Sequence, residues 1–347
     1  MILRLAIIGF GNVGQEFARL LIAKRDWLLK KKGLDIEVVA IATKTRGSIM
    51  ADKALDLERV LRELEQHSSL RGYGPGITDL KPLDIIDKSN ADLMIELTPL
   101  NIDDGQPAID HISIALQSGM DVVTANKGPV AFAYDKLRSL AKSRNAHFRF
   151  EGTVMDGTPV FNLVEKTLQG CEILGIGGVL NSTSNFVLTE IASGRSMDAA
   201  IKEAQRLGFA ESDPSMDIDG WDAAAKITAL ANVLMDAGSN PRLVNRKGIR
   251  GISEVDVRAA ANSGKKFRQI ASATRERGVV ELKVEPVRVG SDSLYWPIDG
   301  TSSAVTLKTD LMGDVTIVET DPAVAQTAYA VLSDILIVVE AIRCGTL

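Results

Sequence analysis

The feature that most constrains the fold is a glycine pattern near the N-terminus. Gly9, Gly11 and Gly14 have the spacing G-x-G-x-x-G. They follow a short apolar run at 3–8, typical of a buried parallel strand, and residues 13–29 continue with helical periodicity. In this context the first glycine allows a tight turn, the second admits a pyrophosphate and the third lets the helix pack closely. The pattern therefore predicts a dinucleotide site at a helix N-terminus.

Strand and helix signals alternate as far as about residue 145. Further buried strands are predicted at 36–42, 92–97 and 121–125, and helices at 54–64, 107–117 and 134–144. Such alternation is typical of a doubly wound α/β fold with a parallel sheet. We therefore expect a Rossmann-type domain over residues 1–145, whose cofactor-binding loop contains Gly9, Gly11, Asn12, Val13 and Gly14.

The middle of the chain has a different pattern. The run RGVVELKVEPVRVG alternates apolar and polar residues, which predicts a half-exposed antiparallel strand, and FRQIASATRER is its candidate hairpin partner. Helical segments lie between such strands, so residues 146–321 are expected to form an α+β domain. The apolar stretch from Ala323 to Ile342 carries Gln326, Asp334 and Glu340, which favours a buried helix over a membrane span. This helix, within about 322–347, is expected to pack back on the first domain.

Composition argues against several classes of protein. The chain has 347 residues and a net charge of −5, so it lacks the basic surface that binds nucleic acid or an anionic membrane. Its two cysteines and three histidines form no disulfide framework and have no metal-ligand spacing. The N-terminal apolar run is too short to span a membrane. We therefore expect a cytoplasmic protein without nucleic-acid or membrane partners.

The end of the second predicted strand indicates which cofactor is preferred. A carboxylate at this position would hold a ribose 2′-hydroxyl and favour NAD. The chain instead reads IATKTRGS, which supplies Lys44 and Arg46 and no carboxylate. Two cations suit a 2′-phosphate, so the sequence predicts a preference for NADP over NAD. The alternative is that both are solvated loop cations.

Two lysines are candidates for the proton donor that carbonyl reduction by a nicotinamide requires. Lys127 lies just beyond a predicted parallel strand, at the sheet edge where open α/β folds bind ligands. Lys226 follows Asp222 by four residues on a helix with apolar or small neighbours. Burial or a charged neighbour can tune a lysine for this work. His111 and His147 lie in helical and strand patterns, so structural roles are expected for them.

An acid-rich segment precedes Lys226. Glu211, Asp213, Asp217, Asp219 and Asp222 fall within twelve residues of GFAESDPSMDIDGWDAAAK. One interpretation is a solvated acidic loop with a surface ion pair. The other is a site that binds an ammonium group and moves a proton.

These segments together resemble the homoserine dehydrogenases along nearly the whole chain. GFGNVG, VVTANKGP, EGTVMDGTP, GGVLNSTSNF and LGFAESDPSMDIDGWDAAAKITALA occur in the family's order, and the last is highly specific. The resemblance implies an NAD(P)-dependent enzyme that interconverts L-aspartate 4-semialdehyde and L-homoserine, on the way to threonine, methionine and isoleucine. It also implies a homodimer in which residues 146–321 bind substrate and dimerise, and a short form without a C-terminal regulatory domain.

The resemblance also assigns roles to individual residues. It implies catalytic roles for Lys127, Asp222 and Lys226, and substrate-binding roles for Thr183, Glu211 and Asp217. Thr98 and Pro99, in IELTP, correspond to neighbours of the nicotinamide. Glu151 and the carbonyl groups of Val154 and Asp156 correspond to a monovalent cation site, usually sodium, although VMDGTP departs from the family's glycine-rich turn.

Two rival interpretations stay open at this point. Another oxidoreductase of the same plan, such as an aspartate dehydrogenase or a dihydrodipicolinate-type reductase, would need different substrate residues. A catalytically silent NADP-binding sensor would keep the glycine pattern, but it would not need Lys127, Asp222 and Lys226 together.

Overall fold

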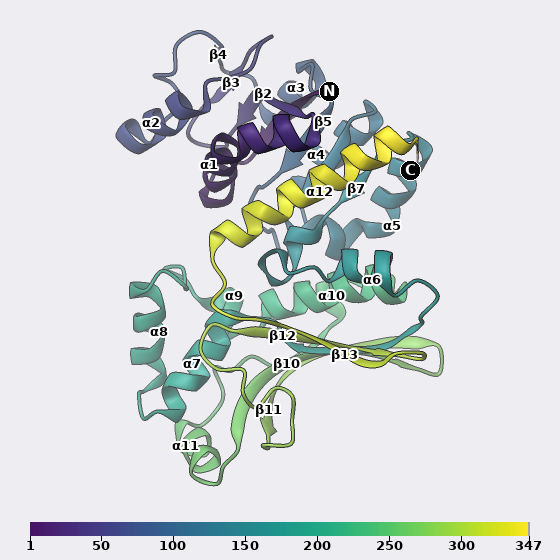
Figure 1. The fold of residues 1–347 in the computed structure, drawn as a ribbon. Coiled ribbons are helices and arrows are strands. Elements are labelled where there is room, and N and C mark those ends of the chain that lie inside the picture. The colour runs from purple at the N-terminus through teal and green to yellow at the C-terminus, as the bar shows by residue number, and fades with distance from the viewer. Residues whose placement is uncertain (346–347) are drawn as a thin grey trace. The chain divides into compact units, whose positions relative to one another are not determined.

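The computed structural model describes residues 1–345, which divide into two compact units (Figure 1). The first unit comprises Met1–Thr158 and the segment from Ala323 onward, and the second comprises Pro159–Pro322. The division falls after Thr158 rather than after residue 145. Two 3₁₀ turns, Glu151–Thr153 and Met155–Gly157, pack against the C-terminal helix α12 (Val324–Cys344) and so belong to the first unit.

The first unit contains a seven-stranded sheet in the order β4-β3-β2-β1-β5-β6-β7. The strands are β1 (Ile2–Ile8), β2 (Asp35–Ala42), β3 (Ser48–Met50), β4 (Ile77–Thr78), β5 (Leu93–Glu96), β6 (Asp121–Thr124) and β7 (Phe148–Arg149). Strands β2, β1, β5, β6 and β7 are parallel, while β3 and β4 form an antiparallel edge. This confirms the predicted Rossmann-type sheet.

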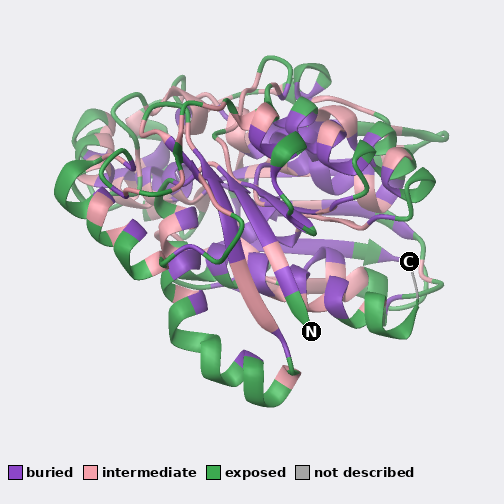
Figure 2. Cartoon of the chain, turned by 90° about the horizontal axis from the view of Figure 1, so that it is seen from above, coloured by how far each residue is buried: buried purple, intermediate pink, exposed green. Residues whose placement is uncertain are grey.

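Helices cover both faces of this sheet. They are α1 (Asn12–Trp27), α2 (Leu57–His67), α3 (Pro82–Lys88), α4 (Ala108–Gln117), α5 (Lys127–Ser143) and α12. Successive strand residues point to opposite faces. Leu5 and Ile7 pack with α1, α2 and α12, whereas Ala6 and Ile8 pack with α3, α4 and α5. The strand that begins at the N-terminus accordingly becomes buried within a few residues (Figure 2). The first unit is doubly wound, as predicted.

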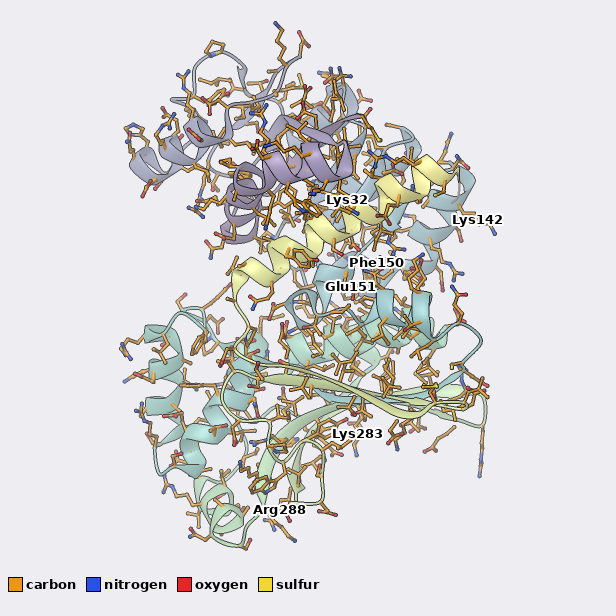
Figure 3. The ribbon with its side chains drawn as sticks, viewed as in Figure 1. Lys32, Lys142, Phe150, Glu151, Lys283 and Arg288 are labelled. Carbon is orange, nitrogen blue, oxygen red and sulfur yellow. The ribbon has the colours of Figure 1, made fainter. Side chains whose placement is uncertain are left out.

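Helix α12 is a core element of the first unit. Within residues 1–345 it is the one helix long and apolar enough to cross a membrane, but half of its most apolar window is buried inside the protein. Asp334, which is 1% exposed, accepts a hydrogen bond from the Glu151 N–H at 2.8 Å and lies 3.9 Å from the Arg149 guanidinium. Glu151 lies beside α12 in Figure 3. A buried carboxylate with such partners is typical of a packed helix in a folded protein.

The second unit contains a six-stranded sheet in the order β13-β12-β8-β10-β11-β9. The strands are β8 (Ile173–Val179), β9 (Asn245–Arg246), β10 (Lys266–Glu276), β11 (Val279–Val289), β12 (Ser303–Thr309) and β13 (Gly313–Glu319). All pairs are antiparallel except β9 with β11. Strands β10 and β11 form the predicted hairpin, with Lys266 opposite Val289. The α+β character is therefore confirmed.

Helix α10 (Trp221–Met235) lies against one face of this sheet, in contact with β8, β10 and β11. The other helices of the unit are α6 (Phe161–Thr167), α7 (Ser182–Ala192), α8 (Met197–Arg206), α9 (Ser215–Ile218) and α11 (Glu254–Asn262). Helices α7, α8 and α11 share a small apolar cluster that includes Ile191, Ala200 and Val257. Ten residues of α10 are buried, which makes it the central helix of the unit.

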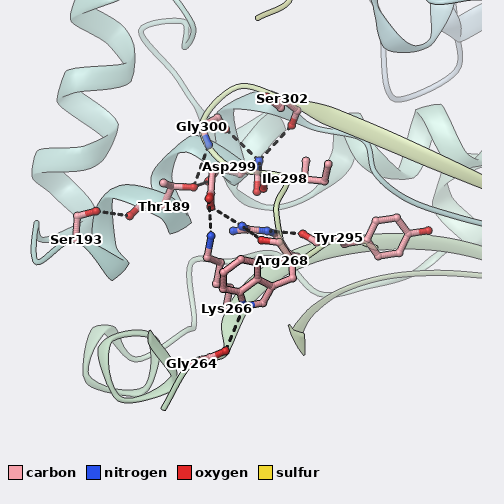
Figure 4. A network of polar contacts seen from close by, with 12 residues as sticks. Thr189, Ser193, Gly264, Lys266, Arg268, Tyr295, Ile298, Asp299, Gly300 and Ser302 are labelled. Atoms are coloured by element: carbon pink, nitrogen blue, oxygen red, sulfur yellow. Dashed lines mark hydrogen bonds and ion pairs between the residues drawn. The ribbon is translucent and has the colours of Figure 1, made fainter. Parts of the chain in front are cut away.

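A polar network ties the loop before β12 to β10 (Figure 4). Arg268, 1% exposed, donates to the carbonyl groups of Tyr295 and Trp296 at 3.1 and 3.0 Å and pairs with Asp299. Lys266 pairs with the same carboxylate. Burial lowers the pKa of Arg268, and Asp299 opposes that shift. The sequence offered no signal for this buried cation, because its partners lie about thirty residues away along the chain.

Candidate active site

The glycine loop has the geometry of a dinucleotide cradle. Gly9 adopts φ +93°, and a Cβ added there would lie 2.6 Å from the Leu97 carbonyl group. At Gly14 an added Cβ would lie 3.1 Å from the Gly9 oxygen, so a side chain would push α1 away. At Gly11, by contrast, an added Cβ would meet no heavy atom of the described residues within 4 Å. Gly11 is also the N-cap of α1 and supplies no side-chain capping bond, which leaves N–H groups for phosphate.

Three cations surround the turn after β2. The Thr43 hydroxyl accepts from the Arg46 N–H at 2.9 Å and donates to the Gly47 carbonyl at 2.7 Å. This turn presents Lys44, which is exposed, and Arg46, which is half-buried. Arg71 lies against the same turn, because a Cβ added at Gly47 would be 3.4 Å from its Cγ. Sequence reasoning missed Arg71, which follows α2 and is far from the turn along the chain.

Loops at the carboxyl edge of β5 and β6 hold the predicted nicotinamide neighbours. The Thr98 N–H donates to the Glu96 carboxylate at 3.1 Å. The Asn126 side chain accepts from the Gly128 N–H at 2.9 Å and so caps α5, whose first residue is Lys127. The same side chain lies 3.4 Å from the Pro99 carbonyl oxygen. The first unit thus brings Thr98, Pro99 and Lys127 to one edge of its sheet, where open α/β folds bind ligands.

In the second unit, two of the five carboxylates converge with Lys226. The Asn181 amide donates to Asp217 at 2.7 Å and to Asp222 at 3.0 Å. The Lys226 ammonium lies 3.0 Å from Asp222 and donates to the Leu180 carbonyl at 2.9 Å. The side chains of Asp222 and Lys226 are each 14% exposed, so they do not form a solvated surface pair. Helix α10 carries both residues one turn apart, as their spacing predicts.

Asp217 is held close to a second negative charge. Burial raises its pKa, and repulsion from Asp222 adds to that rise. Hydrogen bonds from Asn181 and Thr183 and the charge of Lys226 act in the opposite direction. The Thr183 hydroxyl, whose residue is 4% exposed, has one proton and can give it either to Asp217 or to the Phe209 carbonyl, which lies 3.0 Å away. A carboxylate in this environment gains from an added cation, such as the ammonium group of an amino acid.

The remaining acids of the segment have separate positions. Asp213 accepts from the Ser215 N–H at 3.0 Å and stabilises the turn before α9. Asp219 forms an ion pair with Arg250 at 2.7 Å. Glu211 is exposed, and its carbonyl oxygen accepts from the Gln205 side chain at 3.0 Å. The acid-rich segment therefore combines one buried polar cluster with two structural ion or hydrogen-bond pairs.

The predicted cation ligands lie on the two 3₁₀ turns beside α12. Glu151 and Val154 are buried, at 3% and 1% exposure. Met155 and Asp156 adopt left-handed φ values of +51° and +47°, and the Asp156 carboxylate lies 3.4 Å from the Thr327 hydroxyl. Within the described residues, no group of three or more His, Cys, Asp or Glu side chains could hold a metal ion. A sodium site that also uses carbonyl oxygens stays a prediction.

The fold and these clusters define the class of protein: an NAD(P)-dependent oxidoreductase with a Rossmann unit and a separate α+β unit that carries a part-buried Asp–Lys pair. Residues 9–151 match the family described as the NAD binding domain of homoserine dehydrogenase, and residues 159–336 match the family described as homoserine dehydrogenase. The chain therefore belongs to the homoserine dehydrogenase family, whose reaction interconverts L-aspartate 4-semialdehyde and L-homoserine.

Individual relatives agree with this assignment over at least 95% of this chain and of their own. The chain is 35% identical to the NAD(+)-dependent homoserine dehydrogenase of Pseudomonas canavaninivorans, over 96% of this chain and 95% of that one. It is 37% identical to homoserine dehydrogenase of Methanocaldococcus jannaschii, over 95% and 96%. A putative homoserine dehydrogenase from Archaeoglobus fulgidus superimposes with a TM-score of 0.85 at 33% identity, covering 97% of this chain and 99% of that one. A hyperthermophilic archaeal homoserine dehydrogenase in complex with NADPH gives a TM-score of 0.83 at 29% identity, covering 98% of each chain.

These findings support the enzyme and not the silent sensor. The relatives are named as homoserine dehydrogenases, and the chain keeps Lys127, Asp222 and Lys226. The other oxidoreductases of the same plan are likewise not favoured, because the second unit itself matches the homoserine dehydrogenase family.

Proposed function

We propose that Lys226 exchanges the proton in the reduction of L-aspartate 4-semialdehyde to L-homoserine and in its reverse. The main support for this proposal is the position of the Lys226 ammonium group, which lies 3.0 Å from Asp222 and 2.9 Å from the Leu180 carbonyl oxygen. These two acceptors fix the position of the ammonium group. Asp222 orients the lysine and is itself held by Asn181.

The substrate's α-ammonium group binds to Asp217, with Glu211 as a second carboxylate and Thr183 as a hydrogen-bonding neighbour. This proposal is supported by the raised pKa of Asp217, because a carboxylate destabilised by burial and by Asp222 is stabilised by a bound cation. The substrate carboxylate needs a cation of its own. Lys127 is assigned to that contact or to a share of the proton transfer, and this assignment rests on the family resemblance.

When bound, the nicotinamide supplies or accepts the hydride at its C4 atom. Gly9, Gly11 and Gly14, with the N–H groups of Asn12 and Val13, hold the pyrophosphate. Thr98 and Pro99 orient the nicotinamide end. In the reducing direction, Lys226 gives its proton to the oxygen of the former aldehyde as the carbon takes the hydride, so the alkoxide charge is neutralised as it forms.

We also propose a preference for NADP over NAD. Lys44, Arg46 and Arg71 lie around one turn at the end of β2. A 2′-phosphate would receive charge-assisted hydrogen bonds from such a cluster. The Pseudomonas canavaninivorans relative is named for NAD(+), so the preference within this family varies and needs measurement here.

The assembly we propose is a homodimer in the cytoplasm, formed through the sheet face opposite α10. Gly175, Gly177, Ser272 and Thr306 line a hollow of about 310 Å³ on that face, next to Leu174, which is 43% exposed, and Leu294, which is 55% exposed. Small residues flanked by exposed leucines suit a second copy of the same sheet. Light scattering on the wild type and on a Leu174→Asp, Leu294→Asp double variant tests this: the wild type should have twice the mass of the variant.

The decisive assay is the initial rate at which L-homoserine reduces NADP to NADPH or NAD to NADH, with the two cofactors offered separately. Reduction that requires homoserine supports the reaction, and the ratio of the two rates measures the cofactor preference. Repeating the assay in sodium-free buffer tests the predicted cation at Glu151, Val154 and Asp156. Absence of homoserine-dependent reduction, in folded protein that binds NADPH, would contradict the proposed function.

A further inference from the structure

A fully buried carboxylate connects the two loops at the carboxyl edge of the first unit's sheet. Glu96, the last residue of β5, is 0% exposed. One of its oxygens accepts from the Thr98 N–H at 3.1 Å and from the Thr98 hydroxyl. The other oxygen lies 3.3 Å from the Thr124 hydroxyl at the end of β6, and that hydroxyl also lies 2.9 Å from the Glu96 carbonyl oxygen. A single side chain thus contacts the ends of two adjacent parallel strands.

The connection continues to Lys127. The Thr124 hydroxyl accepts from the Asn126 N–H at 3.0 Å, and Asn126 caps the Gly128 N–H at 2.9 Å. Lys127 stands between these two residues and begins α5. The Thr124 hydroxyl thus links Glu96, through its carbonyl group and its carboxylate, to the turn that carries Lys127.

His111 of α4 closes the remaining side of the carboxylate. Its Nδ1 atom lies 3.6 Å from Glu96 Oε1, and the His111 side chain is 4% exposed. Removing a carboxylate from water is costly even with a partner, and buried ion pairs are often no more stable than an apolar replacement. Stability alone is therefore a weak reason for Glu96 at this position.

We infer that Glu96 is a positioning residue for turnover: it fixes the Thr98–Pro99 loop and the Asn126–Lys127 turn in one geometry. This inference rests on the proposed roles of Thr98, Pro99 and Lys127. Because its side chain is 0% exposed, Glu96 is assigned an action through the two loops and not a direct contact with a ligand. Misplacing groups that orient a reacting cofactor lowers the rate even when they do no chemistry.

The same unit contains a matched control at the other end of β6. The Asp121 carboxylate accepts from the His147 N–H at 2.7 Å and lies 2.8 Å from His147 Nδ1. This pair has the same chemistry and is also largely shielded from solvent, at 13% and 12% exposure. Asp121 lies at the amino end of β6, whereas Thr124 ends that strand and Lys127 follows it. The Asp121–His147 pair is therefore expected to affect stability without contacting the Thr98–Pro99 loop or the Asn126–Lys127 turn.

The test compares Glu96→Ala, Glu96→Gln and Thr124→Val with Asp121→Ala in the full-length protein. Each variant is measured for its melting temperature, for NADPH affinity by fluorescence titration, and for kcat and KM with homoserine. We expect Glu96→Ala to weaken NADPH binding and lower kcat, each on the order of tenfold or more, because both loops lose their anchor. Thr124→Val should lower kcat with a smaller effect on NADPH, since it removes the hydroxyl that joins Glu96 to the Asn126 N–H and leaves the Thr98 branch in place.

Glu96→Gln should recover part of both losses. Its oxygen can accept from the Thr98 N–H while its amide donates to the Thr124 hydroxyl oxygen. Asp121→Ala should lower the melting temperature while kcat and NADPH affinity stay near those of the wild type. This pattern separates positioning from general destabilisation.

Three results would overturn the inference: wild-type constants in folded Glu96→Ala, equal losses of kcat in Glu96→Ala and Asp121→Ala, or no recovery in Glu96→Gln. If Glu96→Ala does not fold, the inference is tested by Thr124→Val alone. An unchanged kcat in Thr124→Val would then overturn the inference. Failure of the proposed function would give a different result, because the wild type would then show no homoserine-dependent turnover. The NADPH affinities of the wild type and of Glu96→Ala could still be compared, and they would still test whether Glu96 fixes the Thr98–Pro99 loop.

Discussion

The glycine loop of the first unit and the acid-rich region of the second unit differ in the groups that they offer to a ligand. The glycine loop of the first unit offers backbone groups: at Gly11 an added Cβ would meet no heavy atom of the described residues within 4 Å, and the helix that begins there has no side-chain cap. The acid-rich region of the second unit is already internally bonded, since Asn181 joins Asp217 to Asp222 and Asp222 holds Lys226.

This difference separates binding from turnover. A backbone cradle binds its ligand with groups that do not change charge, so altering it should change cofactor affinity. A bonded side-chain cluster fixes a lysine whose proton must move, so altering it should change the rate. The following predictions test that separation, beginning with the largest effect.

Lys226→Ala should have the largest effect. It removes the proposed proton donor, so kcat should fall on the order of a hundredfold or more. Because the glycine loop belongs to the other unit, NADPH affinity measured by fluorescence titration should stay unchanged. Near-normal turnover would remove Lys226 from the mechanism, and a parallel loss of NADPH binding would break the separation between the two regions.

Asp217→Asn should affect substrate binding first. Loss of the charge that faces the substrate ammonium should raise KM for homoserine by roughly tenfold to a hundredfold, the usual range for a charge-assisted hydrogen bond. Asparagine keeps the shape and can still accept from Asn181, so folding should survive. A wild-type KM in this variant would assign the ammonium to Glu211 instead.

The same variant also has a pH signature. The folded-state pKa of Asp217 is raised above its ordinary value of 3.8, chiefly by burial. Its charged form therefore destabilises the wild type above the folded pKa, and that cost disappears as the pH falls toward 3.8. Asp217→Asn should melt at a higher temperature than the wild type at neutral pH, and the difference should shrink on acidification.

Gly11→Ala should produce the complementary result. The added methyl group has room in the protein but projects into the space reserved for the pyrophosphate. We expect the KM for NADPH to rise about tenfold, with little change in melting temperature or in the kcat reached at saturation. Gly9→Ala is the contrasting control, because φ +93° and the 2.6 Å approach to Leu97 should make it unfold at a lower temperature.

Local patterns predicted much of this molecule. The glycine spacing and the alternation of strands and helices identified the Rossmann unit, because a parallel sheet leaves near-continuous apolar runs. The i,i+4 spacing of Asp222 and Lys226 was sufficient to place them together on α10. Both signals depend on residues that are close in sequence.

What could not be predicted depends on contacts that are distant in sequence. Arg71 reaches the turn after β2 from beyond α2, and Asn181 reaches Asp217 and Asp222 from the N-cap position before α7. The buried Arg268 with Asp299 and the role of Glu96 have the same origin. The sequence of an acidic segment also does not show which of its carboxylates are structural. Asp219 pairs with Arg250 only because the fold brings that arginine close to it.

The smallest predicted effects come from the three cations around the turn after β2. Removing Lys44, Arg46 or Arg71 singly to alanine should raise KM for NADPH only a few-fold each, because exposed charge pairs contribute little individually. KM for NADH should not change, since NADH lacks the 2′-phosphate, and that cofactor serves as the internal control. If Arg71→Ala alters both cofactors equally, Arg71 supports the turn rather than the phosphate. If it alters only NADPH, the preference of this enzyme is set in part by a residue outside the βαβ unit that binds the dinucleotide.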